Sequence, residues 1–268
     1  MSTAALLSVG PTQVVSFSHL QVRHGCSTRV GGVSPEPWGA LNAGFTVADD
    51  PANVWENRHR FAACLGVENV PWLLSMTHGT EVAVVGEKLP IPGDQSKANR
   101  PRYEADACVT DQPGVPLNLT IADCVPVFFH DPVVGCIGLA HAGWRGTVGG
   151  IVTRTLETMS RSYGSQPENV RIGIGPSIGP DAFEVGSEVV EEFQAAFGEV
   201  PGLIRPLPEG GKAKIDLWKA NTVMALRAGA QESNIAVSGW CTHSHPELFF
   251  SYRRDRGVCG RLLAGIIL

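Results

Sequence analysis

Short apolar runs separated by turn residues dominate this chain of 268 residues. Runs bounded by Gly, Pro, Asn or Asp, and without a helical period, are typical of strands that lie in a protein core. They predict strands at residues 14–30, 107–109, 116–121, 125–129, 136–141, 170–174, 235–240 and 248–252. Two further short strands are expected within residues 71–85, on either side of the sequence Thr77-His78-Gly79.

A second group of segments has the signals of helices, and the predicted helices cover residues 50–65, 146–163, 187–196 and 215–228. Asp50 followed by a proline is a frequent helix start, and Asp216 is a candidate N-cap. Ile151, Leu156 and Met159 fall on one face of the second helix, which is expected for a helix that packs against a sheet.

The elements alternate along the chain without an internal repeat and without the change of composition that marks a linker. Residues 90–104 are polar and rich in proline, which predicts a mobile loop or an insertion. We therefore predict one α+β domain over residues 1–268, with mixed β-sheets flanked by helices.

Composition limits the classes of partner. Apolar residues make up 43% of the chain and charged residues 18%, with a net charge of −5. Proteins that bind nucleic acids usually have a basic balance, so we expect no nucleic-acid partner. The first ten residues lack the basic and apolar regions of a signal peptide, and no apolar run is long enough to span a membrane.

The chain has seven cysteines, an odd number, and no pair has the spacing C-x-x-C. This usage fits free thiols in a reducing compartment better than a disulfide framework, so we expect a cytoplasmic protein. Most of these cysteines are interpreted as small buried apolar side chains. A monomer is compatible with the sequence.

Three residues carry most of the chemical information, namely His78, Cys124 and His141. Two imidazoles and a thiolate suit zinc, and three protein ligands leave a fourth tetrahedral position open, as a catalytic metal requires. A strand, a turn and a strand are predicted between Cys124 and His141, so adjacent strand ends can bring the two side chains together. The spacing alone matches no compact zinc-finger pattern.

The neighbours of these residues add an acid and a cation. Asp123 precedes Cys124, and Arg145 follows His141 within the sequence His-Ala-Gly-Trp-Arg-Gly. Asp123 is expected either to orient a ligand histidine or to accept a proton, and we prefer the orienting role.

Taken together, these segments resemble the laccase-domain proteins, once called multicopper polyphenol oxidases and now regarded as zinc-dependent purine nucleoside phosphorylases. The similarity covers nearly the whole chain. The segments that carry it are Gly31-Gly32-Val33-Ser34, Glu56-Asn57-Arg58, His78-Gly79-Thr80, Ala105-Asp106-Ala107, Ala122-Asp123-Cys124-Val125-Pro126, His141-Ala142-Gly143-Trp144-Arg145-Gly146, Gly175-Pro176-Ser177-Ile178-Gly179, Ser251-Tyr252-Arg253-Arg254-Asp255 and Gly260-Arg261.

The resemblance implies that His78, Cys124 and His141 are zinc ligands. It also implies phosphorolysis of adenosine, inosine, guanosine and methylthioadenosine, and deamination of adenosine, so the expected partners are a nucleoside and phosphate. Some bacterial members of the family are described as editing a cell-wall precursor that wrongly carries serine. Two departures from the family pattern are Thr77, where a valine is common, and residues 256–259, which are one residue longer than usual.

Arginine is the side chain best suited to hold phosphate, because its guanidinium group donates two parallel hydrogen bonds. Arg145 or Arg58 is expected to have this role. Asn42 and Ser177 are candidates for contacts to the ribose or the base.

Copper chemistry and serine chemistry are two alternatives. Two histidines and a cysteine also form the equatorial ligands of a blue-copper site, but the chain has one His-x-His pair and no methionine beside Cys124 or His141. Residues 175–179 fit the pattern G-x-S-x-G, and Asp216 and His243 follow in the order of a hydrolase triad. Prolines at both sides of Ser177 fit a nucleophile elbow poorly.

Two further alternatives use the same three residues. In a cysteine hydrolase, Cys124 would be a nucleophile instead of a metal ligand. In a structural zinc protein, the metal would have no open coordination position. Metal content and access to the metal separate these alternatives from a catalytic zinc centre.

Overall fold

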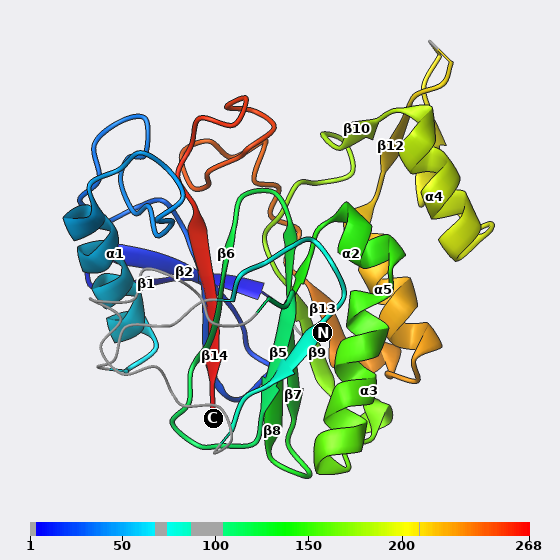
Figure 1. The fold of residues 1–268 in the computed structure, drawn as a ribbon, viewed down its shortest axis with the longest axis horizontal. Helices are drawn as coiled ribbons and strands as arrows, with labels where there is room; N and C mark the ends of the chain where they lie inside the picture. The colour runs from blue at the N-terminus through cyan, green and yellow to red at the C-terminus, as the bar shows by residue number, and fades with distance from the viewer. Residues whose placement is uncertain (1–3, 68–73, 87–103, 209) are drawn as a thin grey trace.

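The computed structural model describes residues 4–67, 74–86, 104–208 and 210–268 of the chain. Its main elements form four layers in the order helix, sheet, sheet, helices (Figure 1). The predicted class, helices flanking mixed β-sheets, is confirmed. The loop expected at residues 90–104 lies outside the described residues except for its last position.

The two large sheets differ in strand direction. The first is antiparallel, in the order β1-β2-β3-β14-β6, and contains β1 (Ala4–Val9), β2 (Thr12–Phe17), β3 (Arg23–Ser27), β14 (Leu262–Ile267) and β6 (Leu117–Ile121). The second is mixed, with parallel pairs at both edges. Its order is β13 (Ile235–Val237), β9 (Arg171–Ile174), β7 (Val125–Asp131), β8 (Cys136–Ala142), β5 (Ala107–Thr110) and β4 (Val82–Val84).

Helices cover the outer face of each large sheet (Figure 1). The first sheet is covered by α1 (Pro51–Cys64), and the second by α2 (Trp144–Val148), α3 (Ile151–Tyr163) and α5 (Leu217–Arg227). A small third sheet joins β10 (Glu184–Val185), β12 (Ala213–Ile215) and β11 (Ile204–Pro206), and α4 (Ser187–Phe197) packs beside it.

The alternation of side chains along β8 explains the two main cores. Ile137 and Leu139 belong to the core between the two sheets, whereas Cys136 and Ala140 belong to the core under the helices. Successive side chains of a strand point to opposite faces, so a strand buried on both faces must be apolar throughout. Ile151, Leu156 and Met159 are buried in the core on the helix side, as predicted.

Two predicted strands differ from the structure. The strand expected at residues 14–30 is divided into β2 and β3 by a turn in which Gln21 has a φ of 54°. The strand expected at residues 248–252 is wrong, because the N–H groups of Leu248 and Phe249 both donate to the carbonyl of His245 and form a turn. Burial of Phe249, and not strand pairing, accounts for the apolar run.

The sequence prediction also misses elements. Neither β1 nor the buried strand β14 is predicted. Of the two strands expected around His78, the structure has β4 after it, and before it only an isolated bridge between Ser75 and Glu104. Residues 71–73 of that expected region lie outside the described part of the chain.

The helix predicted for residues 146–163 is divided into two. Gly150 has a φ of 90°, which a residue with a side chain rarely adopts, and α2 ends before it while α3 begins after it. Both predicted helix starts are confirmed, since Asp50 accepts from the N–H of Ala52 and Asp216 accepts from the N–H of Lys219. Among the helices of the described residues, none has the length and apolar character needed to cross a membrane.

A buried histidine in the hairpin of β2 and β3 provides a test of the fold by pH. His24 Nε2 accepts hydrogen bonds from the Phe17 N–H at 2.8 Å, while its Nδ1 lies 2.7 Å from the Val22 carbonyl. Nε2 is therefore unprotonated in the fold. Burial lowers the pKa of His24 to about 4 and outweighs the opposing effect of the Val22 carbonyl, while His19 and His130 lower the pKa by smaller amounts.

The folded pKa of His24 is below its unfolded value, so the stability from keeping it neutral is complete above pH 6.5 and is lost as the pH falls towards 4. In the unmodified protein, His24 should lower the unfolding free energy by about 2 kcal/mol as the pH falls from 7 to 5. We expect this part of the decrease to be absent in His24→Gln. Urea unfolding at both pH values measures the effect, and the exposed His59→Gln is the control. An unchanged pH dependence in His24→Gln would contradict this role.

Candidate metal centre

A strand pair places two of the predicted ligands together. Cys124 directly precedes β7, and His141 is the penultimate residue of β8. The antiparallel register pairs Val125 with Ala142, so both ligand residues lie at the same end of the pair. The expectation that strand ends bring Cys124 and His141 together is confirmed.

His78 completes the group from the loop before β4. The ligand atoms of His78, Cys124 and His141 all lie within 4.8 Å of one another. His78 is exposed, Cys124 is half-buried and His141 is buried. Two imidazole nitrogens and a sulfur at this separation fit a metal ion, and the donor set suits zinc or copper.

A buried carboxylate, Asp106, fixes both histidines. Its Oδ1 lies 3.0 Å from His141 Nδ1 and accepts from the His78 N–H at 2.9 Å. Its Oδ2 accepts from the N–H groups of Thr77 and Gly79 at 3.1 and 2.7 Å. Asp106 is fully buried and directly precedes β5. One side chain thus holds the loop of His78 against the strand of His141.

These contacts settle how each histidine is presented. Because His141 Nδ1 faces a carboxylate, its Nε2 is the nitrogen available to a metal. His78 has a φ of 62°, which is a strained conformation for a residue with a side chain. Three successive N–H groups, from residues 77 to 79, donate hydrogen bonds to Asp106 and stabilise this conformation. Protein groups therefore hold both histidines in these orientations.

The electrostatic interactions among Cys124, His141 and His78 favour the thiolate form of the cysteine. Burial disfavours charge on Cys124, but His141 and His78 overcome this effect and lower the pKa of the thiol. Burial also disfavours charge on His141, yet Cys124 and Asp106 raise its pKa. The thiolate is the form of cysteine that binds metals, so a cation can replace the proton shared within this group.

Gly143 leaves the space that the group needs. A Cβ at this position would lie 3.1 Å from Cys124 Sγ and 3.1 Å from His78 Cδ2. Its φ of −66° is open to any residue, so the constraint is steric and does not concern the backbone conformation.

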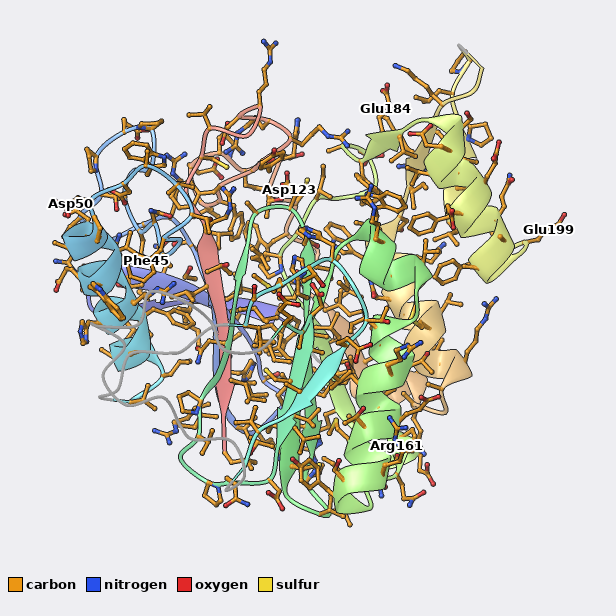
Figure 2. All side chains as sticks on the ribbon, in the orientation of Figure 1. Phe45, Asp50, Asp123, Arg161, Glu184 and Glu199 are labelled. Carbon is orange, nitrogen blue, oxygen red and sulfur yellow. The ribbon has the colours of Figure 1, made fainter. Side chains whose placement is uncertain are left out.

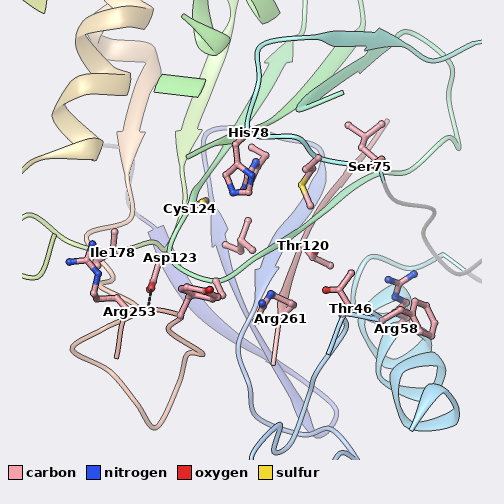
Figure 3. Close-up of a pocket in the computed structure, with 18 of the residues that line it drawn as sticks. Thr46, Arg58, Ser75, His78, Thr120, Asp123, Cys124, Ile178, Arg253 and Arg261 are labelled. Atoms are coloured by element: carbon pink, nitrogen blue, oxygen red, sulfur yellow. Dashed lines mark hydrogen bonds between the residues drawn. The ribbon is translucent and has the colours of Figure 1, made fainter. Parts of the chain in front are cut away.

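The three candidate ligands line a pocket of about 720 Å³. Figure 3 shows two of them, His78 and Cys124, on one side of this pocket. Asp123 lies between the two large sheets near their upper ends in Figure 2, and Phe45 lies beside α1. The lining also includes the aromatic residues Phe45, Trp55, Phe183 and Tyr252 and the arginines Arg58, Arg253 and Arg261. A metal held by His78, Cys124 and His141 would therefore face a pocket that has room for a small molecule.

The two predicted phosphate-binding arginines are in different places. Arg58 lines the pocket and is buried. Arg145 is exposed on α2, with its guanidinium carbon 4.3 Å from the Trp144 ring centre, and it does not line the pocket. The anion-binding role of Arg58 stays a prediction, whereas Arg145 lies outside the pocket lining.

Asp123 lines the pocket, but it does not orient a histidine. Its carboxylate accepts hydrogen bonds from Thr242 Oγ1, Ser251 Oγ and the Arg253 N–H at 2.6, 3.0 and 2.7 Å. The preferred role for Asp123 is thus corrected, because Asp106 has that role. Asp123 instead fastens residues 242–253 to the start of β7, and its role as a proton acceptor stays a prediction.

Asn42 and Ser177 are buried parts of the framework and do not line the pocket. Asn42 Oδ1 accepts from the N–H groups of Gly44 and Arg261 at 3.0 and 2.9 Å. Ser177 Oγ accepts from Trp218 Nε1 at 2.6 Å. No histidine of the described chain hydrogen-bonds to Ser177, and Asp216 caps α5, so the hydrolase triad is not assembled.

Sequence reasoning missed Asp106, Arg253 and Arg261 as site residues, and also Met76, which lines the pocket. The signal for Asp106 was a carboxylate at the start of a buried strand. The signal for Met76 was its position two residues before His78. A thioether near two histidines and a cysteine is relevant to copper, so the identity of the metal needs a direct measurement.

Comparison with known proteins places this site in a family. The family model described as multi-copper polyphenol oxidoreductase laccase matches residues 23–268. A purine nucleoside phosphorylase of Deinococcus radiodurans is 41% identical over 251 residues, which are 92% of this chain and 90% of that protein. The adenosine deaminase RL5 of an unknown prokaryotic organism is 37% identical over 222 residues, 82% of this chain and 84% of that protein.

A solved structure shows the same fold. The crystal structure of YlmD from Geobacillus stearothermophilus superposes with a TM-score of 0.90 at 35% identity, and the match covers 97% of each chain.

Gly143→Ala tests the metal centre without changing a ligand. The added methyl group must displace Cys124 or His78 by a few tenths of an ångström. Because metal–ligand distances tolerate only about 0.2 Å of change, we expect the metal affinity to fall about tenfold or more. Titration with a competing chelator measures it. Gly86→Ala is the matched control, since a Cβ there meets nothing within 4 Å. Equal metal affinity in the two variants would show that the ion binds elsewhere.

Proposed function

Because the chain belongs to the multi-copper polyphenol oxidoreductase laccase family, in which relatives are named purine nucleoside phosphorylase and adenosine deaminase, we propose that it is a zinc-dependent purine nucleoside phosphorylase that also deaminates adenosine. The proposed substrates are adenosine, inosine, guanosine and methylthioadenosine, with phosphate as the second substrate. We also propose that residues 1–268 form one catalytic domain.

The observation that supports this proposal is the position of the candidate ligands. His78, Cys124 and His141 lie at the end of a pocket whose lining also carries three arginines and several aromatic rings. A structural zinc site is closed by four protein ligands, whereas this group has three and opens to the pocket. Aromatic rings suit a purine, and guanidinium groups suit a phosphate.

Zinc fits the donor set, since it prefers nitrogen and sulfur ligands in tetrahedral arrangement. His78, Cys124 and His141 would hold it, Asp106 would orient His141, and Gly143 would leave room for it. When bound, the ion would supply Lewis acidity at this end of the pocket.

In phosphorolysis, a phosphate oxygen forms a bond to C1′ of the ribose as the bond from C1′ to N9 of the purine breaks. The electron pair of the broken bond leaves with the purine, which takes up a proton, and ribose 1-phosphate is the second product. Arg58 would hold the phosphate in the pocket, and Phe183 or Tyr252 would contact apolar parts of the nucleoside. In deamination, water adds at C6 of adenosine and ammonia leaves, which gives inosine.

The first test concerns the role of Cys124. We expect purified protein to contain about one zinc per chain by elemental analysis. In Cys124→Ser the hard hydroxyl replaces a soft thiolate, so zinc and both activities should be lost together, and His141→Ala should behave in the same way.

His243→Ala is the control, because this histidine lies outside the pocket lining and should leave the zinc content unchanged. An inactive Cys124→Ser that keeps full zinc, together with a covalent substrate adduct in the unmodified protein, would identify Cys124 as a nucleophile. Several copper ions per chain would favour the oxidase alternative.

The second test concerns the reactions. Adenosine with phosphate should yield adenine and ribose 1-phosphate, and adenosine alone should yield inosine, as chromatography would show. Both activities should disappear with a chelator and return with zinc, because the same centre is proposed to serve both. Absence of both products, together with oxidation of a phenol and uptake of oxygen, would exclude the proposed function.

A further inference from the structure

Two arginines at the far end of the pocket have no anionic partner. Figure 3 shows Arg58 and Arg261 on the side of the pocket away from His78 and Cys124. Within the described residues, neither guanidinium group forms an ion pair with a carboxylate. Arg58 is buried and Arg261 is half-buried. A cation withdrawn from water without a counter-ion costs free energy, so two of them facing one pocket indicate an anionic ligand.

Arg58 is held rigidly by its surroundings. Its Nε donates to the Ala43 carbonyl at 2.9 Å, and its guanidinium carbon lies 4.3 Å from the ring centre of Phe45 and 5.7 Å from that of Trp55. Only 2% of the residue is exposed, and burial lowers its pKa to about 9. Its two terminal nitrogens have no hydrogen-bond partner among the residues that the structure describes.

Arg261 is fixed in a similar way from the start of β14. One terminal nitrogen, Nη1, donates to the carbonyls of Cys259 and Gly260 at 2.8 and 3.1 Å. The guanidinium carbon lies 5.6 Å from the ring centre of Tyr252. In the described structure, Nε and Nη2 donate to no protein group, so one edge of the guanidinium group is left for a ligand.

The backbone of one residue, Ala43, sets the two arginines relative to each other. The Ala43 carbonyl accepts from Arg58 Nε, and the Ala43 N–H donates to the carbonyl of Arg261 at 2.9 Å. Asn42 Oδ1 accepts from the N–H of Arg261 at 2.9 Å, and the Asn42 carbonyl accepts from Asn57 Nδ2 at 2.8 Å. Asn42 is therefore a positioning residue for Arg261, which explains why a polar side chain is buried there.

The chemistry of the two proposed reactions requires such an arrangement. Deamination occurs at C6 of the purine, and phosphorolysis occurs at C1′ of the ribose, on the opposite side of the base. A nucleoside whose base points towards His78, Cys124 and His141 places its ribose towards the other end of the pocket. An anion held there by two guanidinium groups is then close to C1′.

We infer that Arg58 and Arg261 form a two-arginine subsite for the phosphate dianion, at the end of the pocket remote from the candidate metal ligands. This inference rests on the proposed phosphorolysis, because it assigns the site of the second substrate. The subsite is present before the nucleoside binds, since both side chains are fixed by the protein itself. Phosphate therefore binds to the protein in the absence of nucleoside.

The test compares the effect of each variant on phosphorolysis with its effect on deamination, because deamination needs no phosphate. In Arg261→Gln, and in Arg58→Lys, the KM for phosphate should rise about tenfold or more, since a charge-assisted bidentate contact is lost. The change in the KM for phosphate should exceed any change in the rate of adenosine deamination without phosphate by about fivefold or more, because the deamination reaction leaves the subsite empty. Arg60→Gln is the matched control on α1, since Arg60 does not line the pocket.

Parallel loss of both reactions in Arg261→Gln, or an unchanged KM for phosphate, would overturn the inference. Calorimetric titration with inorganic phosphate, without nucleoside, tests the phosphate subsite independently of the proposed function. Binding to the unmodified protein that is lost in Arg261→Gln supports the subsite, even if no phosphorolysis is found. Absence of binding to the unmodified protein overturns it, even if phosphorolysis occurs.

Discussion

The buried carboxylate of Asp106 is the interaction on which the rest of the site depends. It accepts hydrogen bonds from three N–H groups of the His78 loop and contacts His141 Nδ1, so one side chain positions two candidate ligands. Removing charge from water is costly, and these bonds repay that cost only in the observed geometry. The strained backbone of His78 persists for the same reason. Asp106, which is not itself a candidate ligand, thus fixes the conformation of the two candidate histidine ligands.

The layered fold explains why the pocket has two chemically different ends. Cys124 and His141 come from adjacent strands of the mixed sheet, whereas Arg261 precedes β14 of the antiparallel sheet and Arg58 belongs to the helix that covers it. The two sheets pack face to face and meet in an apolar core. Side chains that extend beyond the ends of both sheets therefore face each other across the pocket. The end with the candidate metal ligands and the cationic end can coexist because each is supported by a different sheet.

Close packing limits what each end tolerates. Gly143 is required beside the candidate ligands because a methyl group would meet both sulfur and imidazole. Asn42 and Asn57 are fully buried near the other end, and their amides connect the chain before α1 with Arg261. Buried amides of this kind specify one arrangement, because leaving any of their bonds unmade is costly. Contacts within the protein thus hold the residues at both ends of the pocket.

The sequence alone determined the class of fold, most strands and helices, and the three candidate metal ligands. Apolar periodicity reports burial, and the segments around His78, Cys124 and His141, together with the family resemblance, identified the candidate ligands. It misplaced the strand at residues 248–252, because an apolar run shows that Phe249 is buried and not how its backbone is bonded.

Only the tertiary structure decided which charged residues serve the site. Asp123 and Arg145 are close to ligands in sequence, yet Asp123 bonds to Thr242, Ser251 and Arg253, and Arg145 lies on an exposed helix face. Asp106 and Arg261 reach the site from distant segments. Adjacent residues of a strand point to opposite faces, so sequence proximity to a ligand is a poor guide to spatial proximity. Strand register and sheet packing, which depend on the whole chain, bring the effective neighbours together.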